Sequence, residues 1–156
     1  MKKDNYTASI AVNKKAADVF RKINQVSGWW TENMEGGSNQ LNDVFTVHFG
    51  ETFVNFKVTE YVPAKKVAWL VTDCYLHWLN DKKEWKGTEV VFDISEQNDM
   101  TKVNFTHIGL EPQVECYNDC VKGWDQYVKS SLVNFIMKGK GQPEMKKTES
   151  KGAAVS

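Results

Sequence analysis

One histidine stands in a position where it could do chemistry. His107 is expected near the end of a strand, with its side chain on the same face as Val103 and Phe105. An imidazole in that position could contact a ligand or act as a general base. The alternative is a core histidine that hydrogen-bonds to backbone or to a Trp or Tyr. The sequence favours the core histidine because no acidic partner stands at a fixed spacing, and we therefore predict no catalytic residue.

The three cysteines, Cys74, Cys116 and Cys120, are the other reactive side chains. Cys116 and Cys120 are four residues apart on an expected helix, a spacing that matches no zinc-binding pattern. We predict no metal site and no cofactor, and expect the thiols to be small apolar fillers of the core. We also predict no disulfide between Cys116 and Cys120, because two Cβ vectors on one helix run roughly parallel.

Aromatic side chains are unusually frequent, with six Trp, eight Phe and five Tyr among 156 residues. Such rings can fill a core, which we expect for at least half of the Trp residues, or line a small-molecule pocket. Trp124 and Tyr127, on an expected C-terminal helix, are the best pocket candidates. The predicted ligand-binding residues are Trp30, Phe56, Trp69, Trp78, Phe92, Phe105, His107, Trp124 and Tyr127.

The elements that must position these residues follow from hydrophobic periodicity. Residues 6–12 alternate as a half-buried strand does, and residues 16–23 have the spacing of a short amphipathic helix. Consecutive alternating segments joined by short turns then predict an antiparallel meander. These segments are residues 45–49, 54–58, 67–71, 90–94 and 103–107.

A long helix is expected after the last strand. Apolar residues recur at three- and four-residue spacing from Tyr117 to Ile136, which predicts a helix of roughly 25 residues with one apolar face. Pro112 suits its first turn, Gly139 its C-terminal cap, and Pro143 stops any continuation. Residues 1–143 thus form one predicted domain, and the polar residues 144–156 a disordered tail.

The predicted fold class is α+β, with a curved antiparallel sheet wrapped around the long C-terminal helix and one or two short helices after the first strand. This order of elements resembles the START-like or SRPBCC superfamily, which has the helix-grip fold of the birch pollen allergen. More narrowly it resembles bacterial members of the family named after the activator of the heat-shock-protein-90 ATPase. The resemblance covers roughly residues 6–141 and is carried by Val19-Phe20, Gly28-Trp29-Trp30, Val67-Ala68-Trp69, Glu84–Thr88, Phe105–Leu110, Cys116-Tyr117 and Gly123-Trp124.

Charge and hydropathy exclude several classes of function. Lys plus Arg and Asp plus Glu both number 20, and a formal net charge of zero argues against a nucleic-acid binder or a polybasic membrane anchor. No apolar run approaches the roughly 20 residues that span a bilayer, and no signal peptide is visible. We therefore expect a cytoplasmic protein with reduced thiols.

Three functions remain open, and the resemblance leaves all three in place because one fold hosts many functions. The favoured one is binding of a small hydrophobic or aromatic molecule in a cavity between the sheet and the C-terminal helix. The second is an enzyme of the cyclase or hydrolase kind in the same cavity, which we consider less favoured than a non-enzyme. The third is a protein-interaction module of the co-chaperone type. We expect a monomer or a weak homodimer.

Overall fold

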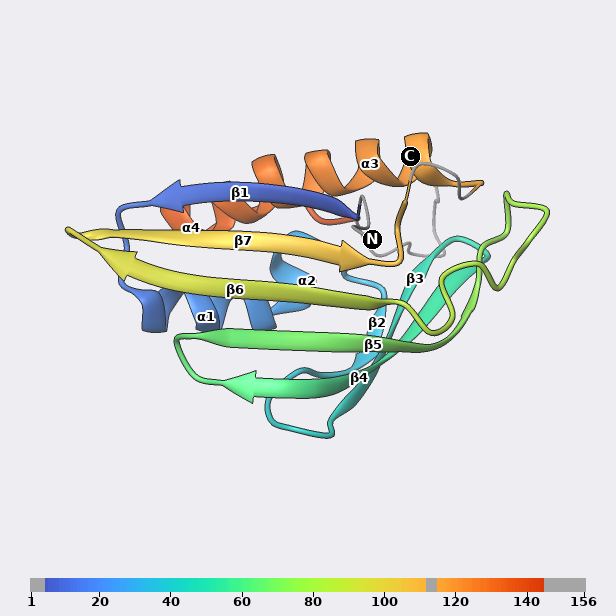
Figure 1. Ribbon diagram of the computed structural model, residues 1–156, viewed down its shortest axis with the longest axis horizontal. Helices are drawn as coiled ribbons and strands as arrows, with labels where there is room; N and C mark the ends of the chain where they lie inside the picture. Colours follow the sequence, from blue (N-terminus) through green and yellow to red (C-terminus); the bar gives the residue numbers. More distant parts are fainter. Residues whose placement is uncertain (1–4, 112–114, 145–156) are drawn as a thin grey trace, which may run out of the picture.

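The computed structural model describes residues 5–111 and 115–144, in which strands and helices follow the expected order (Figure 1). The strands are β1 (Tyr6–Val12), β2 (Met34–Gly36), β3 (Val44–Phe49), β4 (Thr52–Val62), β5 (Lys66–Tyr75), β6 (Glu89–Gln97) and β7 (Met100–Ile108). The helices are α1 (Ala16–Asn24), α2 (Val26–Trp29), α3 (Tyr117–Gln126), the π-helix η1 (Tyr127–Leu132) and α4 (Val133–Lys138).

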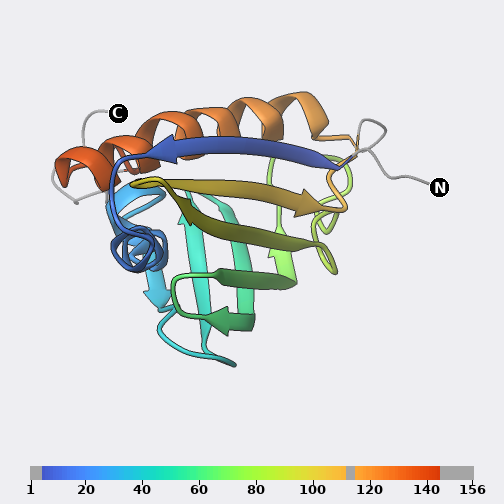
Figure 2. The same ribbon diagram turned by 60° about the vertical axis from the view of Figure 1, so that its left-hand side comes forward.

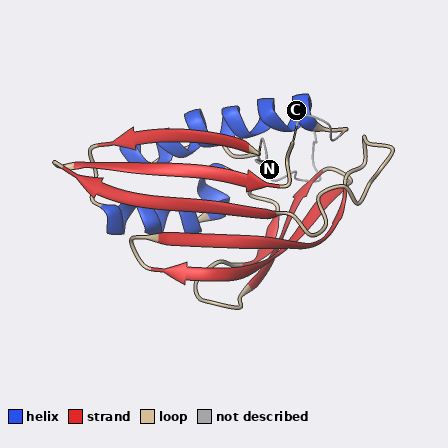
Figure 3. Ribbon diagram, viewed as in Figure 1, coloured by secondary structure: helices blue, strands red, loops and turns tan. Residues whose placement is uncertain are grey.

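The seven strands of the described residues form one antiparallel sheet in the order β1-β7-β6-β5-β4-β3-β2. The sheet is strongly twisted, so that β3 and β4 run steeply across the direction of β1 and β7 (Figure 2). The helices within residues 5–111 and 115–144 all lie on one side of it, and the segment from α3 to α4 extends along β1 (Figure 3). The predicted α+β helix-grip architecture is therefore confirmed.

Alternation of side chains gives the sheet one buried face. In β1, every second residue from Tyr6 to Val12 is buried and the residues between them are exposed. The same period of two places Phe92 and Phe105 toward the helices from the neighbouring strands β6 and β7. Helix α1 covers part of this face with its apolar stripe, which includes Val19 and Ile23. The core thus lies between the twisted sheet and the helices.

The C-terminal helix differs from the single α-helix that the periodicity predicts. It begins at Tyr117, with Cys116 as its N-cap, while Pro112 lies outside the described residues. A π-helical segment, η1, separates α3 from α4. The chain ends its helical course at Gly139, whose left-handed φ of 80° confirms the predicted C-terminal cap.

The π-helical segment holds a buried serine that connects three parts of the chain. The Ser131 hydroxyl donates to the carbonyl oxygen of Trp29 at 2.7 Å, and its Oγ accepts the N–H of Gln142 at 2.6 Å. Extra residues in a π-turn change which side chains face inward, and such turns are frequent at functional sites. Here the inward residue ties the helix to α2 and to the chain that follows α4.

The end of the described chain folds back onto the body. The Glu144 N–H donates to the carbonyl of Trp30 at 2.8 Å, and the Glu144 carbonyl accepts the N–H of Glu32 at 2.8 Å. The two bonds form a parallel bridge between Thr31 and Glu144. The predicted tail began at residue 144, so its first residue belongs to the folded body. Residues 145–156 lie outside the described part of the chain.

The described helices lack the combination of length and apolar composition that crossing a bilayer requires.

Candidate functional site

A cluster of buried rings occupies the space between the sheet and the helices. We call it the aromatic cluster, and each of its rings is less than a tenth exposed. It is drawn from α2 and the residue that follows it, from five strands, from the loop between β5 and β6, and from α3. Its members are Trp29, Trp30, Phe45, Phe56, Trp69, Trp85, Phe92, Phe105 and Trp124.

The rings of the aromatic cluster contact one another directly. Trp124 lies 4.6 Å from Phe105 and 5.0 Å from Trp30, measured between ring centroids. Trp30 and Trp69 are nearly parallel at 6.5 Å, and Trp69 meets Phe92 edge-on at 5.1 Å. These are the separations of rings in van der Waals contact. Side chains therefore fill this part of the wedge around Trp124.

Most of the predicted ligand-binding residues are brought together, and two are not. Trp30, Phe56, Trp69, Phe92, Phe105 and Trp124 belong to the cluster, and His107 borders it. Tyr127 lies at its rim, 6.1 Å from Phe49, where burial raises the pKa of its phenol. Trp78 lies apart, in the loop after β5, with 49% of its surface exposed.

His107 is fully buried and both of its ring nitrogens are occupied. The Trp124 Nε1–H donates to His107 Nδ1 at 3.1 Å, which makes Nδ1 the acceptor and places the proton on Nε2. His107 Nε2 then donates to Thr88 Oγ1 at 2.9 Å, and the Thr88 hydroxyl donates to the Trp85 carbonyl at 2.6 Å. The chain of donors and acceptors is complete, so the imidazole is held as one neutral tautomer.

Burial lowers the pKa of His107 to about 3. Desolvation disfavours the charged imidazolium, and no carboxylate among the described residues hydrogen-bonds to the ring. A general base needs a free nitrogen directed at a substrate proton, and neither nitrogen is free here. These contacts support the core interpretation of His107.

A second buried polar group lies deep in the wedge and is not evident from the sequence. The Ser38 Oγ accepts the Trp69 Nε1–H at 3.0 Å and donates to Asn24 Oδ1 at 2.6 Å. Asn24 in turn donates through Nδ2 to the carbonyl of Phe20 at 3.0 Å. Ser38 is fully buried although it lies in a Gly-Gly-Ser-Asn segment that is typical of a surface loop. The sequence signal for this contact is Trp69, because a buried indole N–H needs a hydrogen-bond acceptor.

A surface groove opens beside this polar group, with a volume of about 390 Å³. It lies between the α1–α2 junction, β2 with the loop that follows it, and α4. Its apolar walls come from Val26, Met34 and Phe135, and its polar groups include Asn24, Ser38 and Asn39. The Phe135 ring sits against Gly28, where a Cβ would lie 2.3 Å from the ring. The glycine therefore lets this ring form one side of the groove.

The prediction that Cys116 and Cys120 form no disulfide is wrong. The structure joins them, with a Cα–Cα distance of 5.6 Å, and leaves Cys74 as a buried free thiol. The prediction assumed that both residues lie within the helix. Cys116 is the N-cap and has non-helical backbone angles, so its side chain is not constrained to run parallel to that of Cys120. The expectation that Cys116 and Cys120 are reduced thiols is therefore also wrong.

Clusters suited to a metal ion are absent from the described residues. No group of three or more His, Cys, Asp or Glu side chains there has a metal-binding arrangement. His48 lies on the outer side of the sheet, in β3, near Glu35. His77 lies in the loop after β5, near Glu51.

Comparison with known proteins defines the fold and leaves the function open. No family model and no curated protein matches the sequence. The solved structure of the Aha1 dimer from Colwellia psychrerythraea has a TM-score of 0.72 and 24% identity, over 88% of this chain and 98% of that one. DynU16, a protein of the dynemicin biosynthetic locus, has a TM-score of 0.66 and 13% identity, over 94% of this chain and 52% of that one. Protein MLL2253 from Mesorhizobium loti also has a TM-score of 0.66, with 14% identity, over 88% of this chain and all of that one.

These likenesses establish the class of structure to which the chain belongs. It shares with these proteins the helix-grip fold, a curved antiparallel sheet with a long C-terminal helix. Within that class the chain resembles Aha1 of Colwellia in its fold.

Proposed function

We propose that the protein binds a small apolar or aromatic molecule between the sheet and the C-terminal helix, through the groove beside Ser38. The groove carries the proposal, because its volume of about 390 Å³ lies within the range of small-molecule sites. Its lining combines three apolar side chains with several polar ones, so that a ligand there would make both apolar contacts and hydrogen bonds.

The position of the groove also supports binding rather than catalysis. Its lining includes Ser38, whose hydroxyl contacts Trp69 of the aromatic cluster. A ligand ring in the groove would contact the apolar Phe135 and Met34 and the polar Ser38–Asn24 pair. The cyclase or hydrolase alternative would use His107, and both nitrogens of that residue are already occupied.

Substitution at the groove tests this proposal. An anilinonaphthalene sulfonate probe would be titrated into the wild type and into Met34→Trp, which places a large ring in the groove. Met137→Trp is the matched control, because Met137 is an exposed methionine on α4 that does not line the groove. We expect saturable binding that Met34→Trp weakens at least about tenfold, or by roughly 1.4 kcal/mol.

The control variant should bind the probe as the wild type does, and both variants should unfold at similar denaturant concentrations. Absence of saturable binding by the wild type, or equal binding by the folded Met34→Trp protein, would contradict a ligand site in the groove.

A surface patch favours protein contact as the second candidate. Phe53 and Tyr75 stack at 6.3 Å on the side of the sheet away from the helices, and the exposed Trp78 follows in the adjoining loop. Exposed apolar groups of this kind often mark interaction surfaces. A second copy of the chain is the proposed occupant, since the similar Colwellia protein is described as a dimer. Sedimentation at rising concentration should show association that Trp78→Ser abolishes, and a monomer at all concentrations would exclude it.

A further inference from the structure

The loop between β5 and β6 (residues 76–88) is fastened to the start of the C-terminal helix by two reciprocal carboxylates. Glu84 accepts the backbone N–H of Glu115 at 2.6 Å and that of Cys116 at 3.0 Å. Glu115 accepts the N–H of Asn80 at 2.9 Å and that of Asp81 at 3.1 Å. These bonds lower the pKa of the Glu115 carboxyl. Each segment thus supplies the acceptor for the amides of the other.

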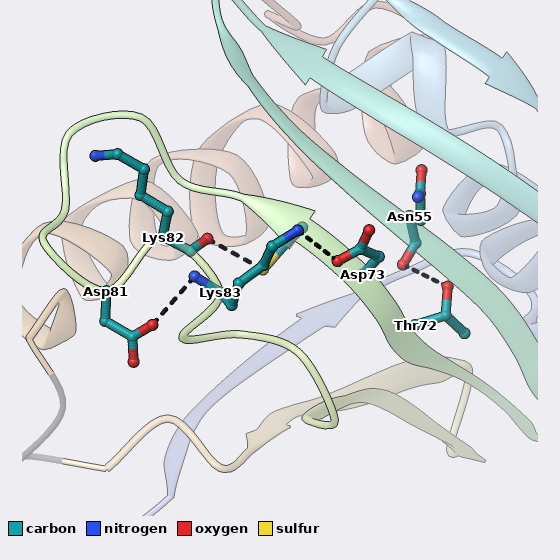
Figure 4. Close-up of polar contacts among 7 residues, drawn as sticks. Asn55, Thr72, Asp73, Asp81, Lys82 and Lys83 are labelled. Atoms are coloured by element: carbon teal, nitrogen blue, oxygen red, sulfur yellow. Dashed lines mark hydrogen bonds and ion pairs between the residues drawn. The ribbon is translucent and has the colours of Figure 1, made fainter.

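The same loop has separate anchors on β5, seen in Figure 4. The Lys82 carbonyl accepts the thiol of Cys74 at 3.6 Å, and Lys83 Nζ pairs with Asp73 at 2.9 Å. Asp81 accepts the N–H of Lys83 at 3.2 Å. The middle of the loop therefore has contacts with β5, at Lys82 and Lys83, that do not involve the helix.

Trp85 connects this loop to the disulfide. Its Nε1–H donates to Cys116 Sγ at 3.3 Å, and its ring stacks on Trp124 at 5.8 Å. Cys116 is fully buried, while Cys120 is 7% exposed. The sulfur of Cys116 thus lies between the loop, the helix N-terminus and the aromatic cluster.

We propose that the Cys116–Cys120 bond is a thiol–disulfide switch, which fastens the β5–β6 loop to the C-terminal helix when closed and releases it when reduced. Closure fixes the N-cap residue, because its sulfur is tied to the first turn and its carbonyl accepts the Cys120 N–H at 2.8 Å. The fixed N-cap holds the two amides that Glu84 binds in place. This inference does not depend on the ligand groove, which includes Phe135 of α4 at the opposite end of the helix (Figure 1).

The chemistry is a two-electron exchange with a dithiol reductant, either a small dithiol or a dithiol protein. A reductant thiolate attacks Sγ of Cys120, the more exposed of the two residues. The S–S bond breaks, and its electron pair goes to Cys116 Sγ. The Trp85 N–H and the helix N-terminus stabilise the Cys116 thiolate, whereas the negative charge of Glu84 destabilises it. The thiolate then takes a proton from solvent. The second reductant thiolate then releases Cys120 as a thiol. The reductant ends as a disulfide, and a small disulfide runs the same steps in reverse.

Reduction should loosen the contact between the loop and the helix. With the bond open, the Cys116 side chain is free to rotate, and the Trp85 N–H and the Glu84 carboxylate lose the fixed geometry of their partners. The amides of Asn80 and Asp81 depend on Glu115 in the same segment. They should then exchange with solvent faster, because local opening costs less free energy.

The test uses the full-length wild-type protein in both redox states. Purified without reductant and then denatured, it should titrate with one free thiol, and with three after dithiothreitol treatment. Hydrogen exchange should be at least about tenfold faster across residues 79–86 in the reduced protein. The variant Cys116→Ser/Cys120→Ser should show the faster exchange with or without dithiothreitol, and Cys74→Ser should respond as the wild type does. Three free thiols without reductant, or equal exchange in both states, would overturn the switch.

Discussion

At the scale of single residues, His107 shows how burial decides between chemistry and structure. Its imidazole accepts from Trp124 and donates to Thr88, so that one ring joins α3 to the chain that leads into β6. A buried polar group with every partner in place specifies one packing arrangement, whereas an unpaired one is costly. The same ring cannot take up a proton without losing the bond from Trp124. His107 therefore favours one packing arrangement at neutral pH, and its protonation in acid destabilises the folded protein.

The acid sensitivity of His107 can be predicted with its sign. The pKa is about 3 in the folded protein against 6.5 as the ordinary value, so the unfolded chain binds the extra proton between these limits. Stability is therefore full above pH 6.5 and is lost as the pH falls toward 3. At pH 5 the loss from this residue should be about 2 kcal/mol. Urea unfolding of the wild type and of His107→Gln at pH 7, 6 and 5 measures it.

The glutamine variant is the comparison that isolates the histidine, since its amide offers both N–H donors and an oxygen acceptor without titrating. Whatever its stability at pH 7, it should lose about 2 kcal/mol less than the wild type between pH 7 and pH 5. Equal losses in the two proteins would assign the acid sensitivity to other groups.

Some of the residue-level interpretation was accessible from sequence, and some was not. Alternation along β7 placed His107 on the buried face, because period two is a local property of a strand. The partners of His107 come from residues far away in the chain, which no local pattern specifies. The Cys116–Cys120 bond depends on where the helix begins, and boundaries are where periodicity is weakest. Trp78 was grouped with the pocket by its type alone, and it lies exposed.

At the scale of elements, two glycines of the C-terminal helical region are predicted to respond oppositely to substitution. A Cβ at Gly123 would meet nothing within 4 Å, and Gly123 lies inside α3, so Gly123→Ala should stabilise the protein by about 0.5–1 kcal/mol. Gly139 has a φ of 80°, so Gly139→Ala should cost about 1–2 kcal/mol. Chemical unfolding measures both changes.

The two substitutions serve as controls for each other, because they add the same methyl group and differ in backbone conformation. A loss of stability in Gly123→Ala would show that this face of α3 is packed against something. No loss in Gly139→Ala would show that the helix can end without a left-handed residue.

Two elements escaped the sequence analysis for physical reasons. Strand β2 has three residues and follows no alternation long enough to recognise, so its pairing with β3 comes from tertiary context. The π-helical turn of η1 leaves the spacing of apolar residues nearly that of an α-helix. By contrast, the six longer strands and α1 were predicted, because each repeats its period over several residues.

At the scale of the whole molecule, the chain after the last helix contributes to stability as far as Glu144. Truncation after Glu144 keeps its two backbone bonds to Trp30 and Glu32, whereas truncation after Gln142 removes both. A backbone hydrogen bond contributes about 1 kcal/mol net, and 1 kcal/mol shifts the midpoint of a domain this size by about 2–4 °C. Thermal unfolding should show little change for the first truncation and a fall of several degrees for the second.

The shorter truncation is the control for loss of the terminal residues themselves. Similar midpoints for both would show that the bridge at Thr31 is energetically neutral. A large fall already after Glu144 would show that residues 145–156 contribute to the fold.

The pairing of β1 with β7 affects how the protein is made. Tyr6 pairs with His107 and Val12 with Thr101, so the first strand must wait for the seventh. A ribosome adds about 5–20 residues per second, so roughly 100 residues take on the order of 5–20 s to synthesise. Throughout that interval the apolar side chains of β1 have left the ribosome without a sheet to cover them. Such long-range pairing slows folding and prolongs the exposure of aggregation-prone apolar surface. The nascent chain should therefore depend on chaperone protection at its N-terminal end until β7 has emerged.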